Sequence, residues 1–278
     1  MVLAERAARL IVMRLFSSEK RLFEGRRGGW PVQVFEKNER RELRFGNHIV
    51  QSAYTPSAPD VLALEYVRAM LAGVLFMPDP EQVLHLGLGG GSLARFLHDH
   101  WPNLRQRVVE INPDVIEASF RFFDLPVSRR LRVTEADAVA FLAENRDPCD
   151  MVFLDAFIPD GPAEGLEEAG LYDTLRRKLA GKGWLVNNVW GSDRERLSRT
   201  IARMAVCFPT LYSVSVRAHS NVILIGGTPA QPPTLSQLTG RAAALSASVP
   251  FDFARWVGRL RPVGTAQRPP GEAWIARA

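Results

Sequence analysis

The sequence of 278 residues predicts an α/β protein with a Rossmann-like, doubly wound and mostly parallel sheet, preceded by a small N-terminal β domain. Three observations predict this class. Apolar, strand-like runs alternate with helix-like segments from residue 82 to about 226. The first run ends at a glycine cluster, Gly87 to Gly91, that leads directly into a helical segment. The alternation closes with two strand-like runs whose linker, residues 217–220, is too short for a crossover helix, which predicts an antiparallel hairpin.

The elements before the glycine cluster follow from local patterns. Residues 1–22 mix basic and apolar side chains without an uninterrupted apolar core, which predicts an amphipathic helix and not a signal peptide. Alternating runs and a Gly46-Asn47 turn predict a small antiparallel sheet over residues 30–55. After a Pro/Ser stretch, Asp60 is a candidate N-cap for a helix that extends to about Val74.

The remaining elements complete the predicted organisation. The domain boundaries are predicted as 1–57 for the N-terminal helix and β domain, 58–230 for the Rossmann-like domain and 231–278 for a C-terminal helical extension and tail. A helical stretch is expected near 235–260, and a Pro-rich tail without regular structure from 262 to 270. The predicted strands are 82–87, 105–111, 131–134, 150–155, 183–189, 211–216 and 221–225, and the helices between them are 92–100, 113–123, 137–145 and 168–179.

Bulk properties exclude several classes of protein. No apolar run reaches the roughly 18–20 residues that a membrane-spanning helix needs, so no membrane partner is expected. The net charge is +5, but the arginines are scattered, which argues against a nucleic-acid partner. The chain has two cysteines, far apart, which fit a cytoplasmic protein without a metal site.

Carboxylates at the predicted strand ends are the candidate functional residues, because the strand ends of such a sheet line the ligand crevice. Glu110 follows Gly87 by twenty-three positions, where a carboxylate accepts hydrogen bonds from ribose hydroxyls. Asp137 follows the third strand and is either the acceptor of an adenine amine, the N-cap of the next helix, or both. Asp155 closes an apolar strand and either faces the reacting end of a bound nucleoside or is a solvated strand terminus. Asn187, Asn188 and Trp190 end the neighbouring strand and either shape a pocket or serve a structural role.

The order of these motifs resembles the spermidine synthase (polyamine aminopropyltransferase) family, which has the class I S-adenosylmethionine-dependent transferase fold. The resemblance covers residues 30 to 226, and its most specific part is Gly161-Pro162-Ala163-Glu164 after Asp155. It implies that Gly87, Gly89 and Gly90 lie under the nucleoside and that Gln51 covers it from the other side. It also implies that Glu110 contacts the ribose, and Asp137 with Ala138 the adenine. The implied cofactor is S-adenosylmethionine, its decarboxylated form or methylthioadenosine.

Two positions depart from the family pattern. The family has an aspartate in the glycine loop where this chain has Gly90, and a second one where it has Ile158. Those acids hold the cationic aminopropyl chain and the amine acceptor, and a close desolvated charge pair is worth several kcal/mol. Their absence favours S-adenosylmethionine itself as the cofactor and methyl as the transferred group, with Asp155 as the catalytic carboxylate and an acceptor less charged than a polyamine.

Several alternatives stay open at the level of sequence. The chain is a methyltransferase acting on a small molecule, or an aminopropyltransferase in which Asp160 or Glu164 replaces the missing acid, or an inactive nucleoside-binding homologue. A metal-assisted O-methyltransferase using Asp155 and Asn187 is disfavoured because that class has an aspartate in place of Asn187. The resemblance also leads us to expect a homodimer.

Overall fold

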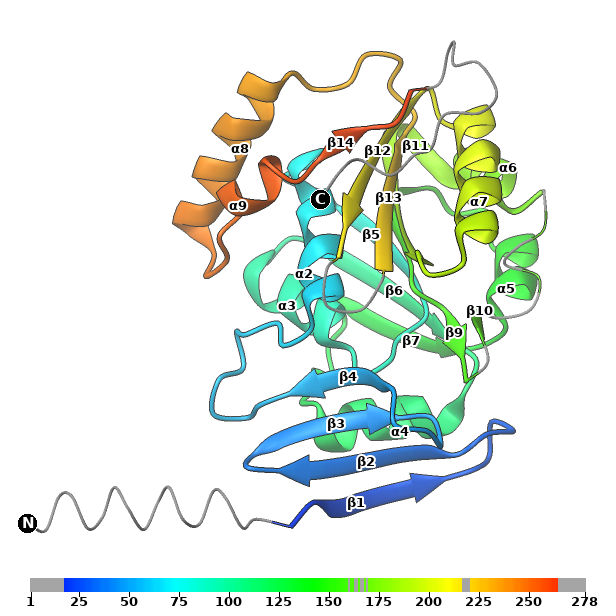
Figure 1. The fold of residues 1–278 in the computed structure, drawn as a ribbon, viewed down its shortest axis with the longest axis vertical. Helices are drawn as coiled ribbons and strands as arrows, with labels where there is room; N and C mark the ends of the chain where they lie inside the picture. The colour runs from blue at the N-terminus through cyan, green and yellow to red at the C-terminus, as the bar shows by residue number, and fades with distance from the viewer. Residues whose placement is uncertain are drawn as a thin grey trace, which may run out of the picture.

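The computed structural model describes residues 18–159, 161–162, 165, 168, 170–216 and 221–264. In this part of the chain, eight strands form the central sheet in the order β14-β12-β13-β11-β8-β5-β6-β7 (Figure 1). The five strands from β11 to β7 are parallel, and β13 is antiparallel to both β11 and β12. The predicted mostly parallel sheet with an antiparallel terminal hairpin is confirmed. The strands are β5 (Gln82–Leu86), β6 (Arg105–Glu110), β7 (Leu131–Glu135), β8 (Cys149–Leu154), β11 (Leu179–Trp190), β12 (Thr210–Ser215), β13 (Asn221–Gly227) and β14 (Arg261–Pro262).

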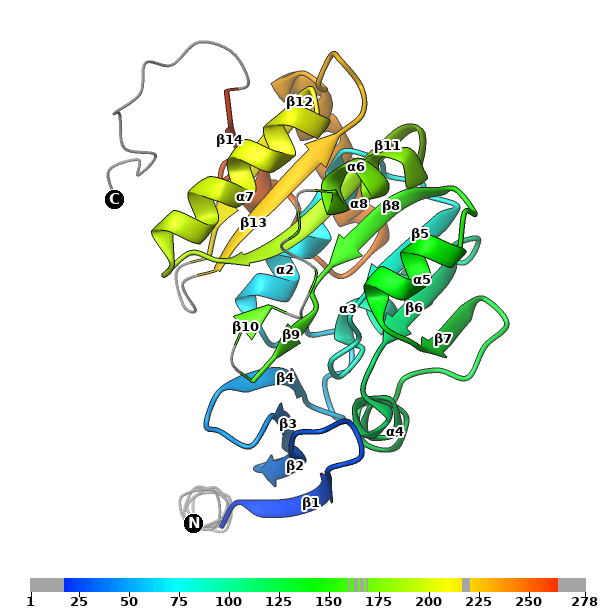
Figure 2. The same ribbon diagram turned by 90° about the vertical axis from the view of Figure 1, so that its right-hand side faces the viewer.

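Helices cover both faces of this sheet, which explains why strands such as β8 are apolar on both sides (Figure 2). The cluster on one face joins the sheet to α2 (Glu65–Leu71), the 3-10 helix η1 (Ala72–Leu75), α3 (Ser92–His100), α8 (Leu235–Ser248) and α9 (Ala254–Val257). The cluster on the other face joins it to α5 (Ala138–Glu144), α6 (Leu171–Lys178) and α7 (Arg194–Cys207). Among the described residues, no helix has the length and apolar character needed to cross a membrane.

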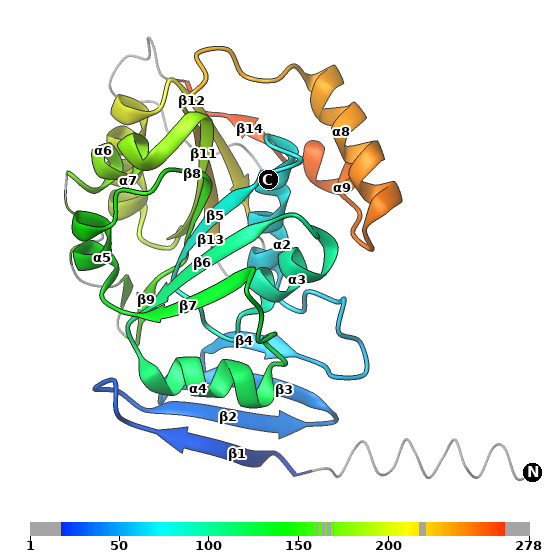
Figure 3. The ribbon, with the colours of Figure 1, turned by 180° about the vertical axis from the view of Figure 1, so that it is seen from behind.

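A separate four-stranded antiparallel sheet precedes the central one, in the order β1-β2-β3-β4. It packs on α4 (Pro113–Phe122) through a cluster that includes Val34, Leu43 and Val115 (Figure 3). This packing places β4 beside the strand ends of the central sheet. The strands are β1 (Lys20–Gly25), β2 (Val32–Lys37), β3 (Arg40–Arg44) and β4 (Val50–Tyr54).

Two predictions for the region before the central sheet were wrong. The predicted N-terminal helix does not extend to residue 22, because residues 20–25 form β1 and pair with β2; residues 1–17 lie outside the described part. Asp60 is not an N-cap: α2 begins at Glu65, and Leu62 and Leu64 are buried in non-helical backbone before it. Core packing of these leucines overrides the local start signal.

The C-terminal extension also differs from its prediction. The helical stretch is broken into α8 and α9, with Pro250 between them. The tail predicted to lack structure begins instead with β14, which pairs with β12 at the edge of the central sheet. A two-residue strand containing proline has no sequence signal, because proline is tolerated at a sheet edge but does not indicate one.

Candidate active site

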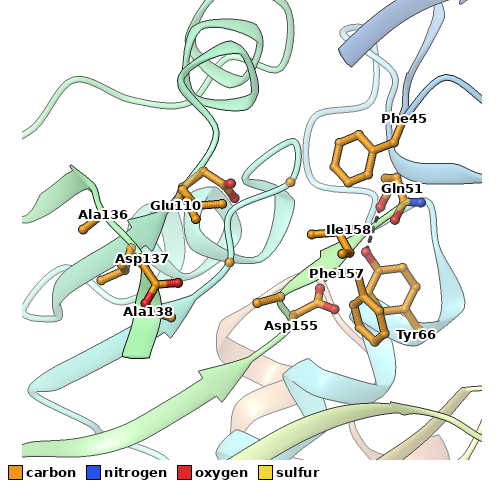
Figure 4. A pocket seen from close by; sticks show the side chains of 15 residues that line it. Phe45, Gln51, Tyr66, Glu110, Ala136, Asp137, Ala138, Asp155, Phe157 and Ile158 are labelled. Atoms are coloured by element: carbon orange, nitrogen blue, oxygen red, sulfur yellow. Dashed lines mark hydrogen bonds between the residues drawn. The ribbon is translucent and has the colours of Figure 1, made fainter. Parts of the chain in front are cut away.

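An open cavity lies at the carboxyl ends of β5, β6, β7 and β8, beneath β4 and the start of α2 (Figure 4). Its empty volume, including open solvent at the mouth, is about 650 Å³. We call it the first lobe. Its described walls are Phe45, Gln51, Tyr66, Gly87, Gly89, Val109, Glu110, Ile111, Ala136, Asp137, Ala138, Asp155, Ala156, Phe157 and Ile158. The structure therefore brings together seven of the eight predicted site residues, all but Gly90.

The glycine loop after β5 needs glycine for steric reasons. Gly87 has φ +98°, and a Cβ there would lie 2.1 Å from the carbonyl oxygen of Asp155. Gly89 also has a positive φ, +54°. Only glycine adopts such angles without strain while lying this close to a neighbouring strand. The loop thus passes directly against the end of β8, and its backbone forms the floor of the first lobe.

Gly90 lies behind the loop and has a different environment. It is buried, and its N–H donates to Ser52 Oγ at 2.7 Å. A Cβ at this position would lie 2.7 Å from Phe123 Cδ1 and 2.8 Å from Ser52 Cβ. Ser52 and Phe123 therefore occupy the space that an acidic side chain at position 90 would need.

Glu110 connects the end of β6 to the glycine loop. Its Oε2 accepts from the Leu88 N–H at 3.0 Å, and its Oε1 accepts from the Asn112 N–H at 2.9 Å. Burial raises the pKa of this carboxyl, and the backbone N–H groups oppose that rise by favouring the ionised form. The carboxylate is held rigidly at the cavity wall, with oxygen lone pairs left for further donors.

Asp137 caps α5, since its Oδ1 accepts from the Ala140 N–H at 2.9 Å. It also lies in the wall of the first lobe together with Ala136 and Ala138. One of the two interpretations left open by the sequence is thus confirmed, and the other, contact with an adenine amine, stays a prediction.

Asp155 follows β8 and belongs to a chain of polar groups. Its Oδ1 accepts from Asn188 Nδ2 at 2.8 Å, and Asn188 Oδ1 in turn accepts from Asn221 Nδ2 at 2.9 Å. Burial raises the pKa of Asp155 to about 6, although the hydrogen bond from Asn188 and the nearby Tyr66 hydroxyl favour the ionised form. A carboxyl with this pKa exchanges its proton near neutral pH, as a general base must.

Tyr66, near the start of α2, links Asp155 to the N-terminal sheet. Its hydroxyl donates to the backbone oxygen of Gln51 at 2.8 Å. Burial, followed by the nearby charge of Asp155, raises the pKa of Tyr66 well above its ordinary value, so the hydroxyl keeps its proton. Figure 4 shows Tyr66 beside Asp155, on the opposite side of the view from Glu110 and Asp137.

A second lobe opens from the first and shares four of its wall residues, including Asp155 and Tyr66. Phe157 and Trp190 stack in its wall with ring centroids 5.5 Å apart and an interplanar angle of 18°. Among its described wall residues Asp155 is the only charged side chain. These residues are Ile49, Val50, Gln51, Leu64, Tyr66, Asp155, Phe157, Asn188, Trp190, Ser192 and Asn221.

The two adjacent asparagines of β11 have different roles. Asn188 faces the second lobe and bonds to Asp155, whereas Asn187 donates to the hydroxyl of Tyr172 at 3.1 Å on the other side of the strand. Asn187 is therefore not directed at Asp155, which removes the pair that the metal-assisted alternative requires. In the described part of the chain, no group of three or more His, Cys, Asp or Glu side chains could hold a metal ion.

Sequence reasoning missed several wall residues. Phe45, Tyr66, Ile111 and Asn221 line the two lobes but were not among the predicted site residues. Ile111 offered a signal, because it follows Glu110 directly at a strand end, where apolar side chains flank a bound ring. Phe45, Tyr66 and Asn221 are distant from the glycine loop in sequence, so local patterns do not indicate that they line the cavity.

The strand order, the terminal antiparallel strand and the carboxylates at the strand ends define a nucleoside-binding transferase with the class I methyltransferase-like fold. Comparison with family models gives a match to the spermine/spermidine synthase domain over residues 65–217. The chain belongs to this family. The N-terminal sheet and the C-terminal extension lie outside the matched residues.

Individual relatives include both kinds of transferase. A polyamine aminopropyltransferase of Chromobacterium violaceum is 31% identical over 235 residues, which cover 83% of this chain and 89% of the relative. An eEF1A lysine and N-terminal methyltransferase of Xenopus laevis is 27% identical over 210 residues, which cover 69% of this chain but 30% of that larger protein.

Solved structures show the same fold. Human methyltransferase-like protein 13 in complex with SAH matches with a TM-score of 0.62 and 25% identity, covering 77% of this chain and 98% of that one. A probable spermidine synthase from Corynebacterium glutamicum matches with a TM-score of 0.65 and 19% identity, covering 95% and 99%. This protein is thus a transferase of the S-adenosylmethionine-related class.

Proposed function

We propose that this protein transfers a methyl group from S-adenosylmethionine to a small acceptor molecule bound in the second lobe. The support comes from the two lobes separately. The first lobe has the features of a nucleoside site, and the second lobe joins it at Asp155, a carboxyl with a pKa of about 6.

The residues of the first lobe fit an adenosine group. Glu110 presents a fixed carboxylate suited to a pair of ribose hydroxyls, and the alanines around Asp137 leave room for a flat ring. Ile111 forms part of the wall while 46% of its surface is exposed, so a stacked ring would bury it. S-adenosylmethionine, when bound, supplies a methyl group made electrophilic by its positively charged sulfur.

The residues of the second lobe can prepare the acceptor. Attack requires a lone pair, so a protonated amine or a hydroxyl of the acceptor must lose its proton. Asp155 Oδ2 is the oxygen that Asn188 does not engage, and it can take that proton. Asn188 and Tyr66 favour the ionised form of Asp155 that must be present before the proton is transferred. The aromatic wall formed by Phe157 and Trp190 suits an acceptor with a flat or apolar body.

The observation that carries the choice of methyl transfer is the small number of charged side chains among the described walls of the second lobe. A diamine acceptor together with an aminopropyl donor brings several positive charges, yet Asp155 is the only charged side chain among the described walls of that lobe. The two family positions that would add acids hold Gly90 and Ile158, and the space at Gly90 is filled by Ser52 and Phe123.

The direct test compares ligands on the purified protein. Thermal unfolding is followed with S-adenosylmethionine, its decarboxylated form, methylthioadenosine and putrescine at one concentration, because a ligand that binds the folded state raises the unfolding temperature more the tighter it binds. We expect S-adenosylmethionine to stabilise most and putrescine not to stabilise. Transfer of a labelled methyl group to a panel of small amines and phenols then identifies the acceptor. Preference for the decarboxylated cofactor would contradict the proposal.

Aminopropyl transfer is the second candidate, favoured by the 31% identity to polyamine aminopropyltransferases. It requires another acid near Asp155. Asp160 and Glu164, which the sequence offers for this role, lie outside the described residues. Formation of spermidine from putrescine and decarboxylated S-adenosylmethionine would establish this candidate. Cofactor binding without transfer to any acceptor would indicate an inactive homologue.

A further inference from the structure

The C-terminal extension, α8 to β14, follows the last strand of the terminal hairpin and lies outside the residues matched by the family model. It packs against the central domain beside α2 and η1 (Figure 1). Phe253 and Trp256 are buried in the same apolar cluster as Leu64 and Val67. Arg241 of α8 donates to the carbonyls of Leu75 and Phe76 at the end of η1, at 3.0 Å each. The extension is therefore part of the structural support of α2.

Arg259, just after α9, makes the most direct contact between this extension and the site. Its Nη1 pairs with Glu65 Oε1 at 2.7 Å, and its Nη2 donates to the Ser215 carbonyl at 2.7 Å. The guanidinium also lies over the Trp256 ring, 4.6 Å from the centroid. The Arg259 and Glu65 side chains are only 21% and 15% exposed, so solvent screens this pair less than an ordinary surface pair.

Each of the two polar contacts of Arg259 is next to a segment that reaches Asp155. Glu65 begins α2 and precedes Tyr66. The Tyr66 hydroxyl donates to the Gln51 carbonyl and lies near Asp155, whose ionised form it favours. Ser215 ends β12, and its pairing partner β13 begins at Asn221, which bonds to Asn188 and through it to Asp155. One guanidinium thus joins α2, which carries Tyr66, to the β12–β13 hairpin, whose Asn221 donates to Asn188.

We propose that Arg259 is a positioning residue that holds α2 and the β12–β13 hairpin at the spacing that keeps Tyr66 beside the Asp155 carboxylate and Asn221 bonded to Asn188, the donor to that carboxylate. The proposal rests on the proposed role of Asp155 as the acceptor-side base. It gives the C-terminal extension a function beyond covering the sheet: the extension sets the geometry of the second lobe.

The test measures the Asp155 carboxyl directly. Its protonation is followed by NMR of the protein labelled with ¹³C at aspartate carboxyls, with Asp155→Asn used to assign the signal. The charged and titratable groups around it are Tyr66 in both lobes and Glu110 and Asp137 across the first lobe, and the described walls contain no lysine or arginine. The variants are Arg259→Met, Arg259→Lys and Glu65→Gln, and the control is Arg255→Met, an exposed arginine on α9, the helix that precedes Arg259.

We expect Arg259→Met and Glu65→Gln to raise the proton affinity of Asp155 about threefold or more, because displacement of the Tyr66 hydroxyl and weaker donation from Asn188 disfavour the ionised form. Arg259→Lys should restore part of the change, and Arg255→Met should leave the titration unaltered. Titration of Asp155 at the wild-type midpoint in both Arg259→Met and Glu65→Gln would overturn the proposal, even if both variants unfold at lower temperature. The titration needs no turnover, so its result does not depend on whether methyl transfer is detected.

Discussion

The two lobes of the cavity are assembled in different ways. In the first lobe, the principal residues follow their own strands directly: the glycine loop after β5, Glu110 at the end of β6 and Asp137 just after β7. In the second lobe, the polar groups come from β4, α2, β11 and β13 and meet around Asp155. The first lobe depends on local backbone geometry, whereas the second depends on how distant elements pack.

This difference suggests where the family can vary in function. The glycine loop and strand-end carboxylates are fixed by the parallel sheet, so the nucleoside site is retained with the fold. The second lobe changes with any shift of α2, the terminal hairpin or the elements behind them. Relatives named as aminopropyltransferases and as methyltransferases share one fold, which agrees with a variable acceptor side. The following predictions test this contrast.

The largest effect is expected at the junction of the lobes. Asp155→Asn keeps an oxygen acceptor for Asn188 but removes the base, so methyl transfer should fall about 100- to 10,000-fold. In the wild type, the pH profile of kcat/KM should rise through about pH 6 and level off above it, following ionisation of Asp155. Binding of S-adenosylhomocysteine, measured by calorimetry, should change little. If Asp155→Asn lowered the affinity for S-adenosylhomocysteine as much as the transfer rate, Asp155 would be needed for nucleoside binding as well as for transfer.

The same substitution should change how stability depends on pH. The pKa of Asp155 is about 6 in the folded protein, above its ordinary value of 3.8. Because the folded state binds this proton more tightly, wild-type stability falls as pH rises from about 4 to 6. Asp155→Asn should gain about 2–3 kcal/mol relative to the wild type across that window, by urea unfolding at each pH. Parallel pH curves for the two proteins would contradict the raised pKa.

Gly90→Asp tests whether the missing family acid can simply be restored. The new Cβ would meet Phe123 and Ser52, so overpacking should destabilise the protein by about 1–3 kcal/mol. Aminopropyl transfer should not appear. Gly240→Asp is the control, because a Cβ at that helical glycine meets no atom within 4 Å. A stable Gly90→Asp protein that makes spermidine would show that one residue separates the two activities.

Glu110→Gln tests the first lobe alone. The substitution removes the charge and one of the two acceptor oxygens that hold the Leu88 and Asn112 N–H groups. We expect affinity for S-adenosylhomocysteine to fall about tenfold, as for loss of a hydrogen bond to a charged group. Glu135→Gln is a matched control, since Glu135 pairs with Glu110 in the sheet register but is exposed. Similar losses in both variants would indicate a long-range charge effect.

The smallest effect is expected from the paired asparagines. Asn188→Ala removes the donor to Asp155 Oδ1, which should move the rise of the pH–rate profile upward by less than about one pH unit. Asn187→Ala should leave the profile in place, because Asn187 bonds to Tyr172. A shift of the pH–rate profile in both variants would show that the position of β11, and not the hydrogen bond from Asn188, sets the pKa of Asp155.

Much of the fold was predictable because strand and helix periods and turn residues are local signals. The alternation predicted the parallel sheet, and the short linker predicted the hairpin. Prediction failed at β1, at the start of α2 and at β14, where pairing or core packing with distant residues overrides the local pattern.

The sequence by itself determined the nucleoside side of the site: the glycines that permit the tight loop, and the carboxylates that follow each strand. It determined these because parallel strands bring their carboxyl ends to one edge whatever the rest of the chain does. Only the tertiary structure decided that Asn188 and not Asn187 contacts Asp155, that Tyr66 reaches the same carboxyl, that Gly90 is enclosed by Ser52 and Phe123, and that Arg259 pairs with Glu65. Each of these contacts joins residues far apart in sequence, and their proximity depends on how whole elements pack.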